Sequence, residues 1–286
     1  FCSNGGGMDT NSIAFKNAKL VEAEGIELIQ FNIFEKFQDS VIHCFTTRKG
    51  GVSTGECSSL NFSFKRNDLY ENVIENYRKL SYALNISMEN MVLSDQVHSN
   101  KVRVVTGADC GKGLLKESDI IGVDALVTNE KNVALVTIHA DCVPIFFYDP
   151  VKKAIGLAHS GWRGTVENIA AETVDKLIDA YGSMPKDIIA AIGPSICSSC
   201  FEVGDEVKEK FEEKIKWSGK YCAKINGKWH IDLKGIIFEA LLNKGIPENN
   251  IFNSGICTMC NKHMFFSHRG EKGKTGSMAA VIKLRR

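Results

Sequence analysis

Long hydrophobic runs are absent from this chain of 286 residues, and no stretch of about 18 consecutive apolar residues offers a membrane-spanning helix. An excess of charge is absent as well, because 35 Lys and Arg residues are balanced by 34 Asp and Glu residues. The net charge of +1 gives no general electrostatic reason to expect nucleic acid or a membrane surface as a partner. No secretory signal-peptide pattern is visible either. The remaining composition, 44% hydrophobic and 24% charged, is that of an ordinary globular protein.

Cysteine, by contrast, is plentiful, with ten residues. In a small secreted domain this number would indicate disulfides, but a chain of this length can bury a core without them. We therefore expect reduced thiols and a cytoplasmic protein. The polar, glycine-rich residues 1–12 are expected to be a disordered terminus or a cloning remnant, and residues 13–286 to form a single catalytic domain.

Hydrophobic periodicity predicts a mixture of strands and helices. Apolar residues recur at helical spacing over 70–84, 165–181 and 233–241, and a charged helix is expected over 203–214. Strands are predicted on both sides of a turn at 24–25, and at 41–47, 124–129, 133–139, 154–160, 187–193, 251–256 and 278–284. Asn226 and Gly227 between two apolar runs indicate a β-hairpin. No internal repeat or linker interrupts these elements, which favours one domain.

Three potential metal ligands or nucleophiles lie where predicted strands end or break, namely His98, Cys142 and His159. Three protein ligands with an open fourth position define a catalytic zinc site, and a set of His and Cys suits zinc or copper. No local spacing rule joins these positions, so only the fold can assemble them. His139 is a competing ligand, and Cys142 paired with either His98 or His159 would equally serve as the nucleophile of a cysteine hydrolase. The pattern alone does not separate these alternatives.

Asp141 stands directly before Cys142, at the end of an apolar run that predicts a buried strand. Pro144 cannot donate a hydrogen bond to a central ladder, so the strand should break near this point. Burying a carboxylate without a partner is costly. We therefore expect Asp141 to meet a hydrogen-bond donor, a metal or a substrate.

Two segments are candidates for binding an anion. After His159 a glycine-containing turn leads into the predicted helix, an arrangement that aims backbone N–H groups at an anion, and Gly161, Arg163 and Gly164 lie in that turn. Arg48 begins a loop rich in glycine and serine, which can expose several backbone N–H groups. A solvated surface loop is the alternative for the second segment.

Two CxxC pairs, Cys197 with Cys200 and Cys257 with Cys260, have the spacing of a structural four-cysteine zinc site. A long segment separates the two pairs, and no compact zinc-ribbon loop encloses them. Plain reduced thiols are therefore the favoured interpretation from the pattern alone.

Several sequence blocks occur together and in order: FTTRKGGVS, SLNFS, QVHSNKV, ADCVP, GLAHSGWRGT, AIGPSI followed by FEVGDE, and KTGSMAAVI. Together they resemble the YfiH-type family over residues 45–284. This family was long described as polyphenol oxidoreductase laccase and was reassigned as purine nucleoside phosphorylase with adenosine deaminase activity. The resemblance implies an α+β or α/β fold of one domain, in which two mixed β-sheets pack face to face between outer helices. It also implies a likeness to cysteine hydrolases of the cytotoxic necrotizing factor type.

The same resemblance implies that His98, Cys142 and His159 are metal ligands, with zinc as the cofactor and copper as a possibility. Arg48 and Arg163 match arginines of family motifs, and their assignment to phosphate is our own inference. The chain departs from the family in having His139 before ADC and in its two CxxC pairs, which leaves an extra metal site open.

The expected function is phosphorolysis of purine nucleosides to the free base and ribose 1-phosphate, with adenosine deaminase activity in addition. Adenosine is the main expected substrate, with inosine, guanosine and methylthioadenosine as others. Asp141 is expected to donate a proton or hydrogen bond to the departing purine. The residues expected to be catalytic are Asp141, Cys142 and Arg48, and those expected to hold phosphate are Arg48, Arg163, Gly161 and Gly164.

Three other functions stay open. A cysteine hydrolase or amidase that edits peptidoglycan precursors would use Cys142 as nucleophile, and a copper-dependent polyphenol oxidase would need more clustered histidines than this chain has. A non-catalytic binding protein would leave the metal ligands and the buried carboxylate unexplained. The expected partners are a purine nucleoside and phosphate, without nucleic acid or membrane, in a monomer or a weak homo-oligomer.

Overall fold

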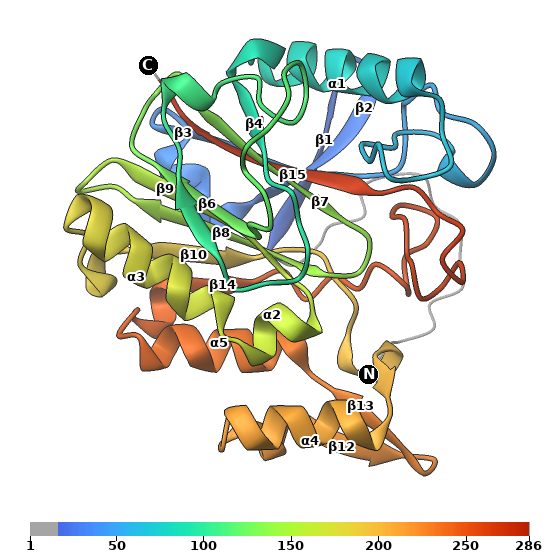
Figure 1. Cartoon of the computed structure of the whole chain (residues 1–286), viewed down its shortest axis with the longest axis vertical. Coiled ribbons are helices and arrows are strands. Elements are labelled where there is room, and N and C mark those ends of the chain that lie inside the picture. Colours follow the sequence, from blue (N-terminus) through green and yellow to red (C-terminus); the bar gives the residue numbers. More distant parts are fainter. Residues whose placement is uncertain (1–16, 286) are drawn as a thin grey trace.

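The computed structural model describes residues 17–285, so the expectation for residues 1–12 lies outside the described part of the chain. Two six-stranded sheets face each other, and helices cover their outer sides (Figure 1). None of the helices in the described part is long and apolar enough to cross a membrane.

The first sheet is antiparallel except at one edge, where β4 runs parallel to β7. Its C-terminal strand β15 lies between β3 and β7, so the end of the chain is built into the middle of the sheet. In order across the sheet, the strands are β1 (Ala18–Ala23), β2 (Ile26–Phe31), β3 (Val41–Thr46), β15 (Met278–Leu284), β7 (Ala134–His139) and β4 (Met91–Leu93).

The second sheet is also mixed, because β14 runs parallel to β10 and β5 parallel to β6. Its centre is the antiparallel pair of β8 and β9, which carries Cys142 just before its first strand and His159 near the end of its second. The order is β14 (Ile251–Asn253), β10 (Ile189–Ile192), β8 (Val143–Asp149), β9 (Ala154–Ser160), β6 (Ala125–Thr128) and β5 (Val102–Val104).

Successive side chains of a strand point to opposite faces of its sheet, so the apolar residues are divided between three hydrophobic cores. In β7, Leu135 faces the core between the sheets and Val136 faces α1 (Tyr70–Leu84), which covers the first sheet. In β8, Phe146 faces the core between the sheets and Phe147 faces the helices over the second sheet. Both faces of β7 and β8 are therefore buried, and the predicted layering of helix, sheet, sheet and helix is confirmed. The likeness to cysteine hydrolases stays a prediction.

The helices over the second sheet are α2 (Trp162–Val166), α3 (Ile169–Tyr181) and α5 (Leu233–Asn243). The prediction of one continuous helix over 165–181 was wrong. Asn168 adopts a left-handed conformation with φ of 57°, which ends α2 and starts α3 in a new direction. The helix over 70–84 is confirmed as predicted.

A small lobe beside α5 was only partly foreseen. It contains α4 (Asp205–Lys214) and a three-stranded sheet in the order β11 (Glu202–Val203), β13 (Lys228–Ile231), β12 (Cys222–Ile225), which Figure 1 shows in orange at the lower edge. The hairpin at Asn226 and Gly227 is confirmed, and both residues have positive φ as a tight two-residue turn requires. The short strand β11 and the third sheet did not appear in the sequence pattern.

Candidate metal centre and cavity

The structure brings His98, Cys142 and His159 together from three separate segments. His98 lies in the loop between β4 and β5, Cys142 in the turn between β7 and β8, and His159 near the end of β9. One donor atom from each residue lies within 4.8 Å of the others, and Cys142 Sγ is 3.7 Å from His98 Nε2. Pairing of strands that are distant in the sequence therefore assembles the predicted set.

Asp124 organises this group, although the sequence pattern did not single it out. Its side chain is fully buried just before β6 and accepts hydrogen bonds from the backbone N–H groups of Val97, His98 and Ser99. The same carboxylate accepts a hydrogen bond from His159 Nδ1 at 2.9 Å. One buried carboxylate thus holds the loop of His98, where φ is 65°, and orients the ring of His159. The sequence feature that could have identified Asp124 is a carboxylate directly before an apolar run that predicts a buried strand.

Charges within this group favour the thiolate of Cys142. Burial alone would raise the pKa of this thiol, but the imidazoles of His159 and His98 bring it down to about 6. Burial would lower the pKa of His159, yet the Cys142 sulfur and the Asp124 carboxylate raise it to about 9. For Asp124, burial is outweighed by His159 and by backbone N–H donors, which bring its pKa down to about 2. The thiolate is the form that binds a metal or attacks an electrophile.

Gly161 makes room for this arrangement. A Cβ atom at this position would lie 2.4 Å from His98 Cδ2 and 3.1 Å from Cys142 Sγ. Gly164 is similarly crowded, with Ser99 O 3.2 Å from a Cβ built at that position. The two glycines of the turn therefore allow close packing against the loop of His98, a role different from the predicted phosphate contact.

His139 lies beside the group, but its ring nitrogens are both engaged. Nε2 is 2.8 Å from Thr137 Oγ1, and Nδ1 is 3.1 Å from the carbonyl oxygen of Cys142. Burial lowers the pKa of His139 well below its usual value, which keeps the ring neutral. The ring packs against that of His159 with centroids 5.1 Å apart. His139 is therefore a buried structural histidine and lies outside the set of three donors.

Asp141 meets hydrogen-bond donors, as expected. Its left-handed backbone, with φ of 85°, turns the carboxylate toward the segment that precedes β15. Thr258 Oγ1 donates to Oδ1 at 2.6 Å, and Ser267 Oγ and the backbone N–H of Arg269 donate to Oδ2 at 3.1 and 2.7 Å. Three hydrogen bonds therefore engage both oxygens of this carboxylate. This arrangement favours an anchoring role over the expected proton donation.

Arg48 is not brought to this site. Its Nη1 donates to Lys262 O and to Glu271 Oε1, both at 2.9 Å, and its Nε donates to Ser58 O at 3.1 Å. The guanidinium also lies 4.4 Å from the ring centre of Phe266. The side chain therefore fixes the loop after β3 to the segment before β15, and its Nε and Nη1 groups are engaged in these contacts.

The side chain of Arg163 is engaged with a neighbouring aromatic ring. It is exposed on α2, a helix of only five residues, and its guanidinium stacks over Trp162 at 4.3 Å. The expectation that a long helix begins directly at this turn is wrong, since α2 ends at Val166.

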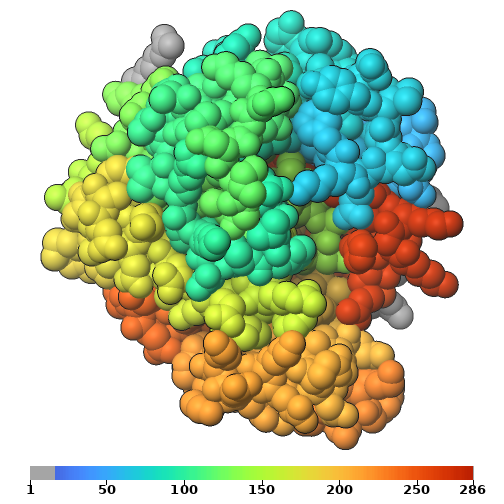
Figure 2. All heavy atoms as spheres, viewed as in Figure 1, coloured from blue at the N-terminus to red at the C-terminus, as the bar shows by residue number. Residues whose placement is uncertain are grey.

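A cavity of about 780 Å³ opens beside Cys142 and His159. Its walls come from residues 62–66, 93–96, 140–142 and 268–269, together with His98, Ile138, His159, Trp162 and Phe201. Figure 2 shows this face hollowed where the cyan, red and yellow-green parts of the chain meet. The volume is in the range of small-molecule sites. Aromatic rings and three cationic side chains, Lys65, Arg66 and Arg269, line it.

Residues 42–285 match the family model described as multi-copper polyphenol oxidoreductase laccase. The chain belongs to this laccase-domain family. It is 39% identical over 248 residues to the purine nucleoside phosphorylase YlmD of Bacillus subtilis, which covers 86% of this chain and 89% of that protein. A purine nucleoside phosphorylase of Staphylococcus saprophyticus is 37% identical over 239 residues, or 83% of this chain and 89% of that one.

Two solved structures of the laccase-domain family share the fold. YlmD from Geobacillus stearothermophilus superposes with a TM-score of 0.86 at 34% identity, over 93% of this chain and 98% of that chain. The Bacillus licheniformis protein YfiH superposes with a TM-score of 0.85 at 36% identity, over 93% and 99%. The resemblance seen in the sequence blocks is thereby confirmed.

Membership of the laccase-domain family implies metal binding, and the donor set of His98, Cys142 and His159 fits a single ion. Two imidazoles and a thiolate are ligand types for zinc and copper. Asp124 on the second nitrogen of His159 supplies the outer carboxylate that usually orients a ligating histidine. Three protein ligands are the number typical of catalytic zinc sites.

Proposed function

We propose that the protein is a zinc-dependent purine nucleoside phosphorylase. It converts adenosine, inosine, guanosine or methylthioadenosine and phosphate to the free base and the ribose 1-phosphate, and it also deaminates adenosine. The observation that carries this proposal is the triad of His98, Cys142 and His159 at the wall of a cavity of about 780 Å³, which is in the range of small-molecule sites. Relatives named purine nucleoside phosphorylase support it.

Aromatic rings in the cavity wall suit a purine. Trp162 and Phe201 both line the cavity, and flat aromatic surfaces stack favourably on one another. Leu93, Ile138 and Ile196 add apolar surface to the same walls. These contacts would remove the base from water and hold the nucleoside with its sugar toward the polar side chains.

Arg66 is our candidate for the phosphate contact, in place of Arg48 and Arg163. Its side chain lines the cavity, and its Nε donates to Ser277 Oγ at 3.1 Å, which orients the guanidinium. Arginine forms paired hydrogen bonds with phosphate oxygens. Lys65 and Arg269 on the same walls would add positive charge.

In the reaction, a phosphate oxygen forms a bond to C1′ while the bond from C1′ to the base breaks, and the base takes up a proton. A zinc ion held by His98, Cys142 and His159 would polarise an oxygen of the phosphate or substrate, and would activate water for deamination. The side chains of the cavity align the two reactants and keep bulk water away from C1′. Asp141 fixes the wall through Thr258 and Ser267.

The test is incubation of the purified protein with adenosine, with and without phosphate, followed by chromatographic separation of adenine from inosine. Phosphate-dependent adenine and ribose 1-phosphate are expected, with a smaller amount of inosine that does not depend on phosphate. Cys142→Ala should abolish phosphorolysis, while Cys222→Ser, at a residue of β12 that neither belongs to the three donors nor lines the cavity, should retain it. Full activity in Cys142→Ala, or no adenine from the wild type, would contradict the proposal.

A cysteine hydrolase is the second candidate. Cys142, His159 and Asp124 also correspond to the thiol, the base and the orienting carboxylate that together activate a cysteine nucleophile. This function predicts an acyl adduct on Cys142, visible by mass spectrometry of the intact protein with a peptidoglycan precursor. It also predicts turnover after the metal is removed with a chelator. A copper oxidase would instead consume oxygen with a phenol only when copper is added.

A further inference from the structure

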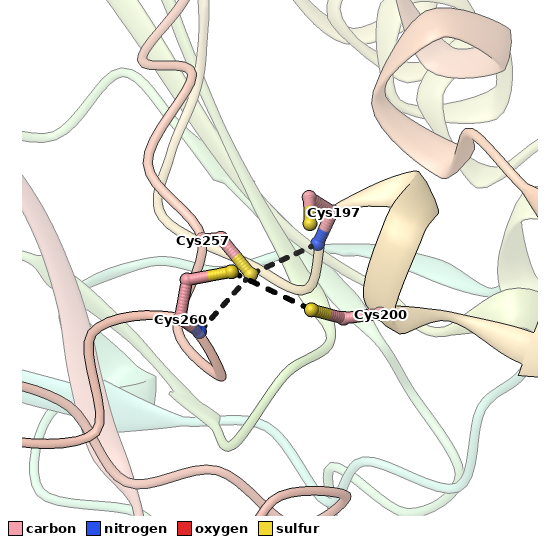
Figure 3. A group of neighbouring side chains, drawn as sticks. All are labelled: Cys197, Cys200, Cys257 and Cys260. Carbon is pink, nitrogen blue, oxygen red and sulfur yellow. Dashed lines mark hydrogen bonds between the residues drawn. The ribbon is translucent and has the colours of Figure 1, made fainter. Parts of the chain in front are cut away.

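A second cluster of metal-binding side chains lies apart from the cavity donors. The two CxxC pairs, distant in sequence, converge so that one sulfur from each of the four residues lies within 4.8 Å of the others. Figure 3 shows Cys197 and Cys200 on one segment, and Cys257 and Cys260 on another, with their side chains gathered between the two. We call Cys197, Cys200, Cys257 and Cys260 the four-cysteine cluster.

Backbone pairing explains why the two segments meet. Residues 193–197 continue from the end of β10 and residues 254–258 from the end of β14, and these strands are parallel neighbours. The pairing extends past the strands as a bridge between Ser195 and Cys257. Ser195 N donates to Ile256 O, and Thr258 N donates to Ser195 O, each at 3.2 Å. The sheet therefore fixes both pairs of cysteines side by side.

The sulfur separations fit thiolates around an ion. Cys200 Sγ lies 3.5 Å from Cys260 Sγ, whereas the two sulfurs of a disulfide are about 2.05 Å apart. A tetrahedral zinc ion with bonds of about 2.3 Å places its sulfur ligands about 3.8 Å from one another. Four sulfurs within 4.8 Å need only small rotations to reach that geometry.

Hydrogen bonds to sulfur support the same interpretation. The backbone N–H groups of Cys197 and Cys260 donate to Cys257 Sγ, at 3.3 and 3.4 Å. Two such donors stabilise negative charge on this sulfur. The turn of the first pair is closed as well, since Cys200 N donates to Cys197 O at 3.1 Å.

A buried lysine supplies a compensating charge. Lys234 on α5 is only 5% exposed, and its Nζ donates to Ile256 O, the residue just before Cys257, at 3.0 Å. Four thiolates around a divalent ion carry a net negative charge, which a nearby ammonium group stabilises. A buried lysine without such a partner would be costly.

We propose that the four-cysteine cluster binds a structural zinc ion. Four sulfur ligands in closed tetrahedral arrangement are typical of structural zinc sites. The ion would join the segment that leads into the lobe of β11, α4, β12 and β13 to the segment that returns from β14. It would thus lock the base of this lobe onto the second sheet.

The cluster is also coupled to the cavity through its sequence neighbours. Ile196 N, next to Cys197, donates to the carbonyl oxygen of Asp141 at 3.0 Å. Thr258, next to Cys257, donates to the carboxylate of Asp141 at 2.6 Å. Both segments that carry the cysteine pairs therefore contact Asp141, the residue that precedes Cys142 in the cavity wall. Loss of the ion is expected to loosen this wall as well as the lobe.

The first experiment isolates the cluster in Cys142→Ser protein, in which the cavity donor set lacks its thiolate. Elemental analysis should find about one zinc per chain in this variant. Zinc-edge X-ray absorption should show four sulfur neighbours at about 2.3 Å and no imidazole shell. Absence of bound metal, an iron absorption spectrum, or disulfides among the four cysteines by mass spectrometry would overturn the proposal.

The second experiment removes one ligand of the four-cysteine cluster in the otherwise intact protein. Cys260→Ser, at the most exposed of the four ligands, should lose zinc from the cluster while leaving the cavity donors in place. The matched control is Cys222→Ser, whose thiol contacts Ser218 O in the same lobe and belongs to neither donor group. Equal zinc content in both variants would overturn the proposal.

The test of the zinc site at the four-cysteine cluster is independent of the test of nucleoside phosphorolysis in the cavity. If the protein proves inactive toward nucleosides, a four-sulfur zinc spectrum in Cys142→Ser still supports the structural site. If phosphorolysis is observed but that spectrum is missing, the structural site is wrong and the proposed function stands. Should Cys260→Ser fail to fold, the spectrum of Cys142→Ser decides alone.

Discussion

The carboxylate of Asp124 lies 2.9 Å from Nδ1 of His159 and at the same time accepts the N–H of His98 at 3.0 Å. Two donors of the candidate metal centre therefore depend on a residue that does not itself belong to the donor set. Because β6 pairs with β9, the start of one strand brings this carboxylate beside the end of the other.

Asp124→Asn should weaken metal binding at the cavity. The amide has the same shape but carries no charge, and it cannot accept all the hydrogen bonds that hold His159 and the loop of His98. Loss of such an outer carboxylate typically costs about 10- to 100-fold in metal affinity or activity. Competition titration with a zinc chelator measures the affinity. Asp119→Asn, on the surface, is the control, and equal affinity in both variants would contradict the assignment.

Gly161→Ala should reduce activity more than it reduces stability. The new methyl group would meet His98 and Cys142 at less than contact distance, so the imidazole must move away from the sulfur. We expect phosphorolysis to fall by about tenfold or more, as small displacements of reacting groups commonly cause. Gly219→Ala is the control, because a Cβ there has no neighbour closer than 3.8 Å. Unchanged kcat/KM in Gly161→Ala would show that the close approach is unimportant.

Arg66→Ala should raise KM for phosphate, whereas Arg163→Ala should leave it nearly unchanged. Arg66 lines the cavity, whereas Arg163 is not among the lining residues and stacks over Trp162. Loss of a hydrogen bond to a charged group costs about 1.5–3 kcal/mol, which corresponds to a rise of at least about tenfold. Steady-state kinetics at varied phosphate concentration provide the measurement. The opposite pattern would return the phosphate site to the turn after His159.

Asp141→Asn and Thr258→Val should both destabilise the fold through the same contact. The hydroxyl of Thr258 donates to Asp141 at 2.6 Å in a buried setting, and each substitution should lower the free energy of unfolding by about 1–3 kcal/mol. Because the two residues share one hydrogen bond, the double variant should lose less than the sum. Denaturant unfolding measures this coupling. A proton donor would behave differently, with kcat falling about 100-fold or more in Asp141→Asn at unchanged stability.

Stability should decrease on acidification partly through His43. Its Nε2 accepts the N–H of Phe31 at 2.8 Å, and burial lowers its pKa from 6.5 to about 3. Below about pH 6.5 the imidazole of the unfolded chain binds a proton, which the folded protein excludes. The stabilisation of the folded state by neutral His43 is therefore fully present above pH 6.5 and is lost as the pH falls toward 3. Between pH 7 and pH 5 the loss from this residue should be about 2 kcal/mol.

His43→Gln keeps an acceptor for Phe31 but has no titrating ring. The difference in unfolding free energy between pH 7 and pH 5 should therefore shrink by about 2 kcal/mol relative to the wild type. Urea unfolding of both proteins at the two pH values gives this difference. An identical pH dependence in the two proteins would show that His43 is not excluded from protonation.

Local sequence pattern determines many elements of this protein. The helix Tyr70–Leu84 follows from a single apolar stripe, and the hairpin at Asn226 follows from the conformational preference of two turn residues. The apolar runs of β7 and β9 predicted strands because both of their faces are buried, whereas β8 was not predicted as a strand. The sequence blocks around His98, Cys142 and His159 indicated the family and the donor set.

Tertiary structure decided which of the candidate side chains meet. Asp124 contacts the metal-ligand candidates because β6 pairs with β9. Arg48 is directed elsewhere, because it forms an ion pair with Glu271 from a distant segment. The four-cysteine cluster formed because β10 and β14 are parallel neighbours, although the sequence between them is long. Periodicity and turn chemistry act over a few residues, so they determine elements and strand ends. Distances between side chains depend on strand pairing over the whole chain, which no local pattern contains.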